Sequence, residues 1–250
     1  MSEVQQLLGE ISRCSIARDI RSGSSTVSIA CREIVSLQAE VEFQLPEPWS
    51  GQIDMAPILF ISSNPSIDEH EDYPNTSWES SRTADFFGNR FNPASGWVKD
   101  GLYPRQRDGS WSTDWVRFWA SARARAGEIL QRKATPGVDF ALTEVVHCKS
   151  RSERGVAAAR NICSDRYLEK VISASAAKVL IVYGRQAEEA IHRCFASRMT
   201  ACGGVLRCVL IGNKPRMLVF LPHPAGYGSK SLEAGVGHDG LKLIRVHMTL

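Results

Sequence analysis

The sequence predicts an α/β protein in which a mostly parallel sheet of four to five strands lies between two layers of helices. Short apolar runs end in small polar residues, a pattern typical of buried parallel strands, and amphipathic segments separate these runs. Strands that alternate with helices form a sheet covered on both faces, which is a three-layer α/β/α sandwich. The 250 residues suit one domain, 1–250, with a helical segment over residues 1 to about 45.

The expected elements follow one another along the chain. Residues 7–20 and 27–43 have helical periodicity, and a Gly-Ser break separates them. Strands are expected at 57–62, 140–147, 178–183, 205–211 and 217–221, and helices at 115–130, 155–173 and 185–195. Residues 63–112 are rich in Asn, Pro, Gly and Ser, and irregular segments of this length are usually functional.

Composition excludes several classes of protein. No run approaches the roughly 18 apolar residues of a membrane span, and the N-terminus MSEVQQLLGE is unlike a secretory signal peptide. Seven cysteines at irregular spacing predict reduced thiols and a cytoplasmic protein. The net charge of +3 identifies no partner, but basic residues gather at 117–133 and 149–166. Such clusters attract DNA phosphates, although they could equally be solvated helix faces.

Polar motifs follow three of the expected strands. Ser62-Ser-Asn-Pro-Ser66 follows the first strand, Glu144 lies near the end of the second, and His223-Pro224 follows the last. Ligands of parallel sheets bind beyond the carboxyl ends of the strands. We therefore expect Asn64, Glu144 and His223 to share one site.

These motifs resemble those of the uracil-DNA glycosylase superfamily. ISSNPS is similar to its first motif and LPHPAGYG to its second, while EDYP…W…DFFGNRF resembles its base-pocket loop. Residues 143–148, Cys163 and KVLIVYGRQA are similar to the middle of the iron–sulfur branch. The resemblance spans roughly residues 55–230. It implies an enzyme that flips a nucleotide out of DNA and breaks its N-glycosidic bond.

The resemblance implies a role for each matching residue. Asn64 would orient water or carbonyl groups at the sugar, and His223 would donate a hydrogen bond to the base O2, where charge collects. Phe86 would stack on the base, and Tyr227 would press into the duplex. Taken alone, Asn64 would be a turn residue and Phe86 a core residue. The remaining contacts implied are with the base for Ser63, Pro65 and Glu144, and with DNA for Ser66, Lys149, Arg151 and Ser229.

Glu144 stands where the iron–sulfur branch carries a base-reading Asn. An ionised carboxylate would be repelled by uracil O4, whereas it accepts a hydrogen bond from the amino group of cytosine. We therefore expect a cytosine-type base, unless Glu144 is simply paired with a nearby cation. A bulky mark must distinguish the target from ordinary cytosine, and the chain is similar here to antiviral glycosylases that excise glucosylated hydroxymethylcytosine from phage DNA. The residues expected to contact the substituent are Asp68, Glu69, Asp72, Asn75 and Trp78.

Four cysteines are candidate metal ligands. Cys148 and Cys163 match two ligands of the iron–sulfur branch, but the usual Cys-x-x-Cys pair is missing. Cys14 and Cys31 are the candidates for the other two positions. The resemblance thus implies one [4Fe–4S] cluster held by four thiolates. The alternative is that the thiols are buried as small apolar side chains.

Two further functions remain open. Excision of uracil or a deaminated base in DNA repair would keep every role except that of Glu144. A non-catalytic DNA-binding module is the other alternative, because Asn64 cannot take a proton as Asp would. No lysine stands out as a Schiff-base nucleophile, so the abasic product is expected to stay uncut. In each case we expect a monomer with DNA as its partner and no contact with a membrane.

Overall fold

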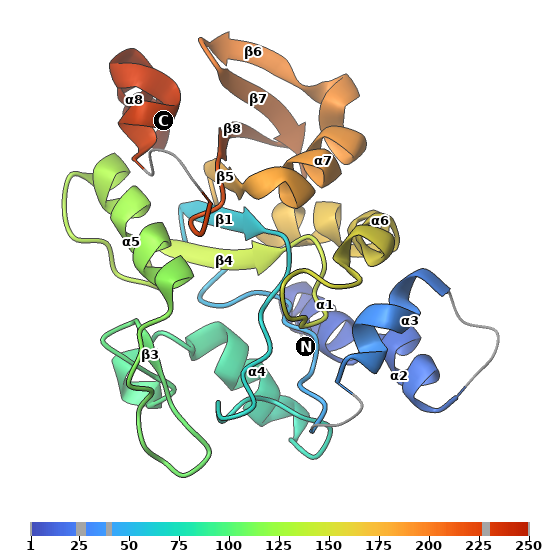
Figure 1. The fold of residues 1–250 in the computed structure, drawn as a ribbon. Coiled ribbons are helices and arrows are strands. Elements are labelled where there is room, and N and C mark those ends of the chain that lie inside the picture. Colours follow the sequence, from blue (N-terminus) through green and yellow to red (C-terminus); the bar gives the residue numbers. More distant parts are fainter. Residues whose placement is uncertain (1, 24–28, 39–41, 227–230, 250) are drawn as a thin grey trace.

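A six-stranded sheet forms the centre of the protein in the computed structural model, which describes residues 2–23, 29–38, 42–226 and 231–249 (Figure 1). The strand order is β4-β1-β5-β8-β7-β6. The strands are β1 (Ile58–Ser62), β4 (Phe140–Glu144), β5 (Val179–Tyr183), β6 (Thr200–Gly203), β7 (Leu206–Ile211) and β8 (Lys214–Leu221). The first four strands in this order are parallel to one another. The strand β7 is antiparallel to β8, and β6 is antiparallel to β7. The predicted mostly parallel sandwich is confirmed. The strand β7 matches the one expected at 205–211, and β6, which the sequence did not predict, pairs with β7 at the edge and brings the sheet to six strands.

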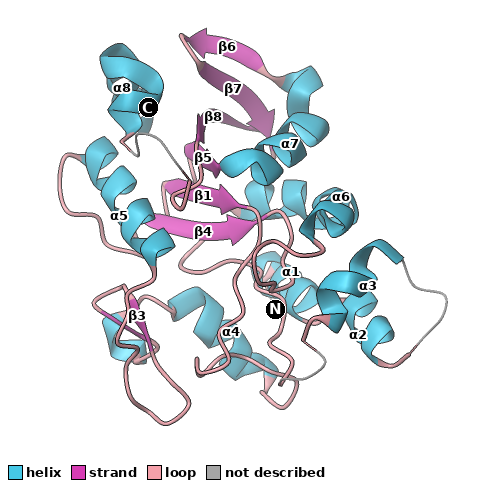
Figure 2. Cartoon of the chain, viewed as in Figure 1, coloured by secondary structure: helices cyan, strands magenta, loops and turns pink. Residues whose placement is uncertain are grey.

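Helices cover both faces of this sheet (Figure 2). The helices α6 (Val156–Ala174) and α7 (Gly184–Phe195) pack on one face, and α5 (Arg117–Leu130) and α8 (Leu232–Thr249) pack on the other. Side chains of β1 alternate between the two cores, so Ile61 faces the α6–α7 side and Phe60 the α5–α8 side. This burial of both faces explains why the parallel strands are unbroken apolar runs in the sequence. No helix in the described ranges has the length and apolar character that crossing a bilayer requires.

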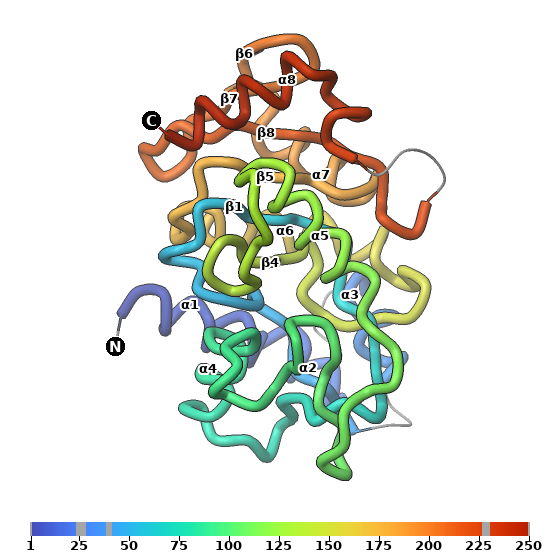
Figure 3. Tube along the Cα trace, turned by 90° about the vertical axis from the view of Figure 1, so that its left-hand side faces the viewer, coloured from blue at the N-terminus to red at the C-terminus, as the bar shows by residue number. Residues whose placement is uncertain are grey.

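The N-terminal segment forms three short helices, α1 (Glu3–Ser12), α2 (Ser15–Arg21) and α3 (Ile29–Ser36). They pack against α6 and against α4 (Ser80–Asn89). Figure 3 shows them at the end of the molecule opposite to α8 and the β6–β7 hairpin. The single helix expected over 7–20 is interrupted at Cys14, which is the residue before α2.

The sequence did not predict two of the helices. The helix α4 lies inside the segment expected to be irregular, where it is followed by η1 (Pro93–Ser95) and the two-residue strands β2 (Val98–Lys99) and β3 (Tyr103–Pro104). The helix α8 contains several glycines, which lower helical propensity, and its backbone kinks at Gly237. Packing against α5 and β8 therefore decides its conformation, and the local sequence does not.

A disulfide joins Cys202 and Cys208 across the β6–β7 hairpin. The expectation of reduced thiols is therefore wrong for this pair. The Cα atoms are 5.7 Å apart, within the usual range for a disulfide. Spacing alone could not indicate the bond because it depends on the register of the hairpin. The other five cysteines, including Cys194, are free.

Candidate active site

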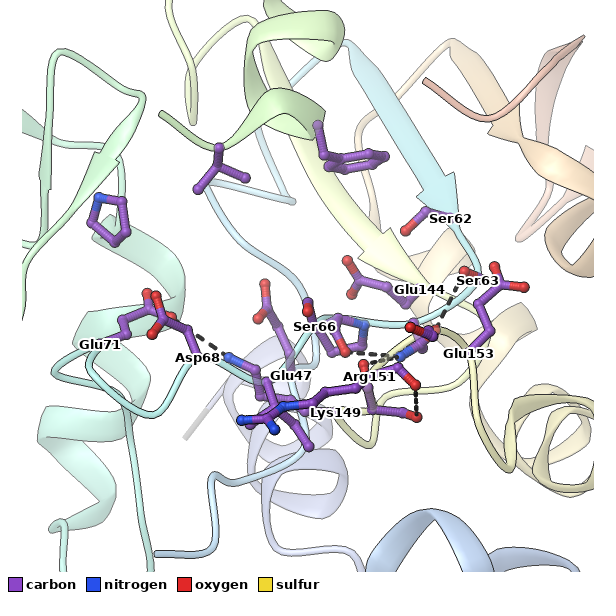
Figure 4. A pocket seen from close by; sticks show the side chains of 18 of the residues that line it. Glu47, Ser62, Ser63, Ser66, Asp68, Glu71, Glu144, Lys149, Arg151 and Glu153 are labelled. Atoms are coloured by element: carbon purple, nitrogen blue, oxygen red, sulfur yellow. Dashed lines mark hydrogen bonds and ion pairs between the residues drawn. The ribbon is translucent and has the colours of Figure 1, made fainter. Parts of the chain in front are cut away.

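Three strand ends open into one cavity of about 620 Å³ at the carboxyl edge of the parallel strands. The turn after β1 supplies Asn64, the end of β4 supplies Glu144, and the residues after β8 supply His223. Figure 4 shows labelled side chains from the ends of β1 and β4 and from distant segments around a common space. The cavity wall also includes Ser62, Ser63, Pro65, Ser66, Asp68, Glu69, His70, Val116, Phe118 and Arg151.

Two carbonyl groups fix the orientation of the Asn64 side chain. Its Nδ2 donates to the carbonyl oxygens of Pro65, at 2.8 Å, and Ser150, at 3.3 Å. Its Oδ1 accepts only a long hydrogen bond of 3.4 Å from the Ser63 hydroxyl among the described residues. This leaves Oδ1 able to accept a hydrogen bond from a water molecule in the cavity.

A backbone contact fixes the tautomer of His223. Its Nδ1 accepts a hydrogen bond of 3.2 Å from the backbone N–H of Ala225, so in the neutral ring the proton lies on Nε2. Burial lowers the pKa of His223, an effect that Glu153 partly offsets, and the neutral form is favoured. The ring lies nearly parallel to that of Phe118, with centroids 6.3 Å apart. His223 can therefore donate from Nε2 without carrying a charge.

Buried ion pairs form the floor of the cavity. Arg90, from the turn after α4, lies 3.0 Å from Glu47 and also bonds Glu71, and Lys149 Nζ lies 3.6 Å from Glu71. The Tyr73 hydroxyl donates to Glu47 at 2.9 Å. Burial raises the pKa of Glu47, but the charges of Arg90 and Lys149 outweigh burial and the net shift is downward. The floor therefore holds two cations and two carboxylates, and its charges balance.

Glu144 is a fifth ionisable group beside this balanced set. Its side chain is buried, Oε2 has no hydrogen-bond partner among the described residues, and no ion pair reaches it there. Burial raises the pKa of Glu144 well above its usual range, and the Glu47 charge raises it further, while Arg90 and Lys149 only partly offset this. This environment favours the neutral, protonated form of the carboxyl over the ionised form that the sequence suggests. The alternative of a salt-bridged Glu144 finds no partner among the described residues.

Residues 48–235 match the sequence model of the uracil DNA glycosylase superfamily. The chain belongs to this superfamily. No curated protein gives a match. Membership supports DNA glycosylase activity, hydrolysis of the bond between a base and its deoxyribose, with DNA as the partner. It also fits the observed site, in which Asn64 and His223 occupy the ends of β1 and β8.

The aromatic side chains Phe118 and Trp119 line the cavity, and neither is the one that the sequence predicted. Phe86 is 1% exposed and packs edge-on against Tyr73 and Trp78 in an aromatic cluster behind the cavity wall. The assignment of Phe86 as the base-stacking residue is therefore wrong. Phe118, in the first turn of α5, is only partly buried and lines the cavity beside His223. Nothing in its local sequence separates it from a core residue.

The predicted DNA contacts divide into three groups. Lys149 lines the cavity but is buried, with its Nζ 3.4 Å from the centre of the Tyr73 ring, so a contact of this residue with the DNA backbone is not supported. Arg151 is exposed, pairs with Glu69 and lines the cavity together with Ser66. The predicted wedge Tyr227 and the predicted contact Ser229 lie outside the described residues.

The residues expected to contact a base substituent are also divided. Asp68 and Glu69 line the cavity. Asp72 instead lies 3.7 Å from Arg82, the Asn75 side chain accepts from Ser77, and Trp78 is buried. The polar side-chain atoms of Asp72 and Asn75 are therefore engaged within their own segment.

The four candidate cluster ligands line a second, small cavity of about 20 Å³. Cys14 and Cys31 reach it from the N-terminal helices, Cys148 from the segment after β4, and Cys163 from α6. Burial raises the pKa of Cys31 to about 11 and that of Cys163 to about 12, so without a metal both are neutral thiols. Among the described residues no group of three or more His, Cys, Asp or Glu side chains is arranged to hold a metal ion.

The charged floor is the part of the site that sequence reasoning missed. Glu47 precedes β1, and Glu71 and Arg90 lie in the long segment between β1 and α5. The only available signal was the presence of charged residues among aromatic ones in EDYP and FFGNRF. Their pairing depends on tertiary structure.

Proposed function

We propose that the protein is a monofunctional DNA glycosylase that flips out and excises a pyrimidine with a bulky 5-substituent. The substrate we propose is glucosylated 5-hydroxymethylcytosine of phage DNA, and the role we propose is antiviral defence. The observation that carries this proposal is a cavity of about 620 Å³, larger than a bare pyrimidine needs, whose lining includes Glu144 with no hydrogen-bond partner for its Oε2 among the described residues.

The size of the cavity supports a decorated base. One water needs only about 10–15 Å³ of cavity volume on this measure, so 620 Å³ leaves room for a substituent beside a pyrimidine ring. Asp68, Glu69, His70 and Glu153 line the same cavity. Carboxylates and imidazoles accept hydrogen bonds from hydroxyl groups, which a sugar substituent supplies in number.

The orientation of the two strand-end residues supports hydrolysis of the glycosidic bond. A water held by Asn64 Oδ1 would lie ready for the sugar carbon as positive charge develops there. His223 Nε2–H would donate to the base O2, where negative charge collects as the bond breaks. The face of the base would lie against Phe118, a stacking contact that is sequence-tolerant.

A protonated Glu144 supports recognition of a cytosine edge. Its carbonyl oxygen would accept from the N4 amino group, and its O–H would donate to N3. The same neutral carboxyl can instead donate to uracil O4 and accept from N3–H. Because a neutral carboxyl can pair with uracil in this way, a second candidate function is the excision of uracil or another deaminated base in repair.

We also propose that Cys14, Cys31, Cys148 and Cys163 hold one [4Fe–4S] cluster. Four free thiols line one small apolar cavity, and four thiolates are the donor set of a [4Fe–4S] cluster. Their side chains would have to rearrange around the cluster, since among the described residues they are not arranged to hold a metal ion. A cluster there would tie α2, α3 and α6 to the segment that follows Glu144. Its contribution would be to hold this segment, whose Ser150 carbonyl orients Asn64.

One panel of DNA duplexes tests the proposed function. Each duplex carries uracil, 5-methylcytosine, 5-hydroxymethylcytosine or its glucosylated form at one position, and alkaline cleavage reveals the abasic site. We expect cleavage of the glucosylated duplex and none of the 5-methylcytosine duplex. His223→Ala is the control for contaminating activity. Efficient release of uracil with no release from the glucosylated duplex would overturn the substrate and favour the repair function.

A further inference from the structure

We propose that Glu144 is the general acid of the reaction, and that it transfers its proton to N3 of a cytosine-type base as the glycosidic bond breaks. This inference rests on the proposed function, because it requires the cavity to hold a base with a cytosine edge. It goes beyond that function by giving Glu144 a catalytic role in addition to recognition.

The geometry of the carboxyl group is the first argument. Glu144 is the last residue of β4, pairs in register with Ser62 of β1, and lines the same cavity as Asn64 and His223. Its Oε2 is fully buried and has no partner among the described residues. In Figure 4 the side chain extends from the end of β4 into the space that the labelled residues surround. A buried polar atom without a partner in the protein calls for an explanation, and a ligand in the adjoining cavity supplies one.

The surrounding charges are the second argument. Three charged groups face Glu144: Glu47 from the segment before β1, Arg90 from the turn after α4, and Lys149 from the segment after β4. Both cations are already engaged by Glu47 and Glu71. Burial and the Glu47 charge hold the pKa of Glu144 well above its ordinary value, which favours the form of the carboxyl that still carries its proton. Two carboxyl groups with oppositely shifted pKa values are typical of an acid that works beside a permanent anion.

The chemistry of the base is the third argument. Cytosine has a lone pair on N3, so a carboxyl O–H that donates to N3 can also release its proton there. Uracil carries a hydrogen on N3 and offers no lone pair at that atom. A proton transferred to N3 removes the negative charge that would otherwise develop on the departing cytosine, which makes the base a better leaving group.

This step conserves atoms and electrons. The Glu144 proton moves to N3 while the bond between C1′ and N1 breaks, and the bonding electron pair stays on N1. The base departs as a neutral tautomer with hydrogen on N3, and Glu144 is left as a carboxylate beside Arg90 and Lys149. Water adds its oxygen to C1′ and releases one proton to solvent. A solvent proton then restores Glu144 before the next turnover.

A matched variant separates acid catalysis from simple recognition. Glu144→Gln keeps one acceptor for N4–H and one donor for N3, but the amide has no proton to give. Two substrates with the same glucosyl substituent complete the design, glucosylated 5-hydroxymethylcytosine and glucosylated 5-hydroxymethyluracil. Glu188→Gln on the exposed face of α7 is the control for an equivalent change elsewhere, and thermal melting confirms that each variant folds.

Single-turnover rates and substrate affinity give the decisive comparison. We expect Glu144→Gln to lower the rate on the cytosine substrate by 10²–10⁴-fold, the usual contribution of a general acid, with affinity changed less than about threefold. We also expect the wild-type rate on this substrate to fall at high pH and the variant rate to be flat. Any rate on the uracil-edge substrate should be the same for both proteins.

Two results would overturn the inference. A Glu144→Gln rate on the cytosine substrate within about threefold of wild type would show that Glu144 only recognises the base. An equal loss on both substrates would show that the variant disturbs the cavity. If the wild-type protein releases neither base, the proposed function itself fails, and that outcome is distinguishable from both of these.

Discussion

Replacement of Arg90 with Met tests whether the buried floor is held together by its charges. The Arg90 side chain is 3% exposed and bonds both Glu47 and Glu71. Met keeps an apolar contact with Phe86 and Trp119, whose rings lie 4.9 and 4.8 Å from the guanidinium carbon, but it removes the cation. Lys149 alone cannot balance two buried carboxylates. Breaking a buried pair in this way costs about 3–5 kcal/mol of unfolding free energy.

Urea denaturation at neutral pH, followed by circular dichroism, measures this loss. Arg198→Met is the matched control, because Arg198 forms a bidentate pair with Glu169 at 2.7 and 3.0 Å but both side chains are substantially exposed. An exposed pair of this kind contributes about 0–1 kcal/mol. We expect Arg90→Met combined with Glu47→Gln to recover part of the loss, since it removes one uncompensated charge. A loss for Arg90→Met no larger than that for Arg198→Met would refute the reasoning.

Four further predictions concern the site and the cysteines. His223→Ala should lower the single-turnover rate about 10²–10³-fold, as loss of one transition-state donor does, and an unchanged rate would exclude that role. Asn64→Ala should also lower this rate at nearly constant DNA affinity, which a binding titration checks. The pKa of Glu144 is raised in the folded state, so the protein loses stability as the pH rises above 4.5, the pKa of this group in the unfolded chain. Glu144→Gln removes this loss and should raise the melting temperature more at pH 8 than at pH 4. Cys148→Ser with Cys163→Ser should abolish iron–sulfur absorbance in anaerobically purified protein, whereas Cys194→Ser should not.

The layers of the fold could be predicted from the sequence because buried parallel strands have a strong local signal. In an apolar run such as 179–183 every residue is buried, because both faces of the strand are covered. The same logic placed Asn64 and His223 at one edge of the sheet, since both directly follow a strand. Helix α8 gave no comparable signal, because its glycines disfavour a helix that tertiary packing nevertheless forms.

The details of the site depend on contacts that local sequence does not encode. Phe86 and Phe118 are both aromatic residues in helical surroundings, and only the path of the chain decides which one faces the cavity. The protonation state of Glu144 depends on burial and on Glu47, which lies nearly one hundred positions earlier in the chain. From the sequence alone a carboxylate is expected to be ionised.

Detection of the free base by mass spectrometry tests the central claim most directly. Wild-type protein is incubated with duplex DNA that carries glucosylated 5-hydroxymethylcytosine at one position, and the small-molecule fraction is compared with that from His223→Ala. The account predicts release of the intact glucosylated base from wild type, one for each abasic site, and almost none from the variant. Tight binding of this DNA by the wild-type protein with no base released would contradict it.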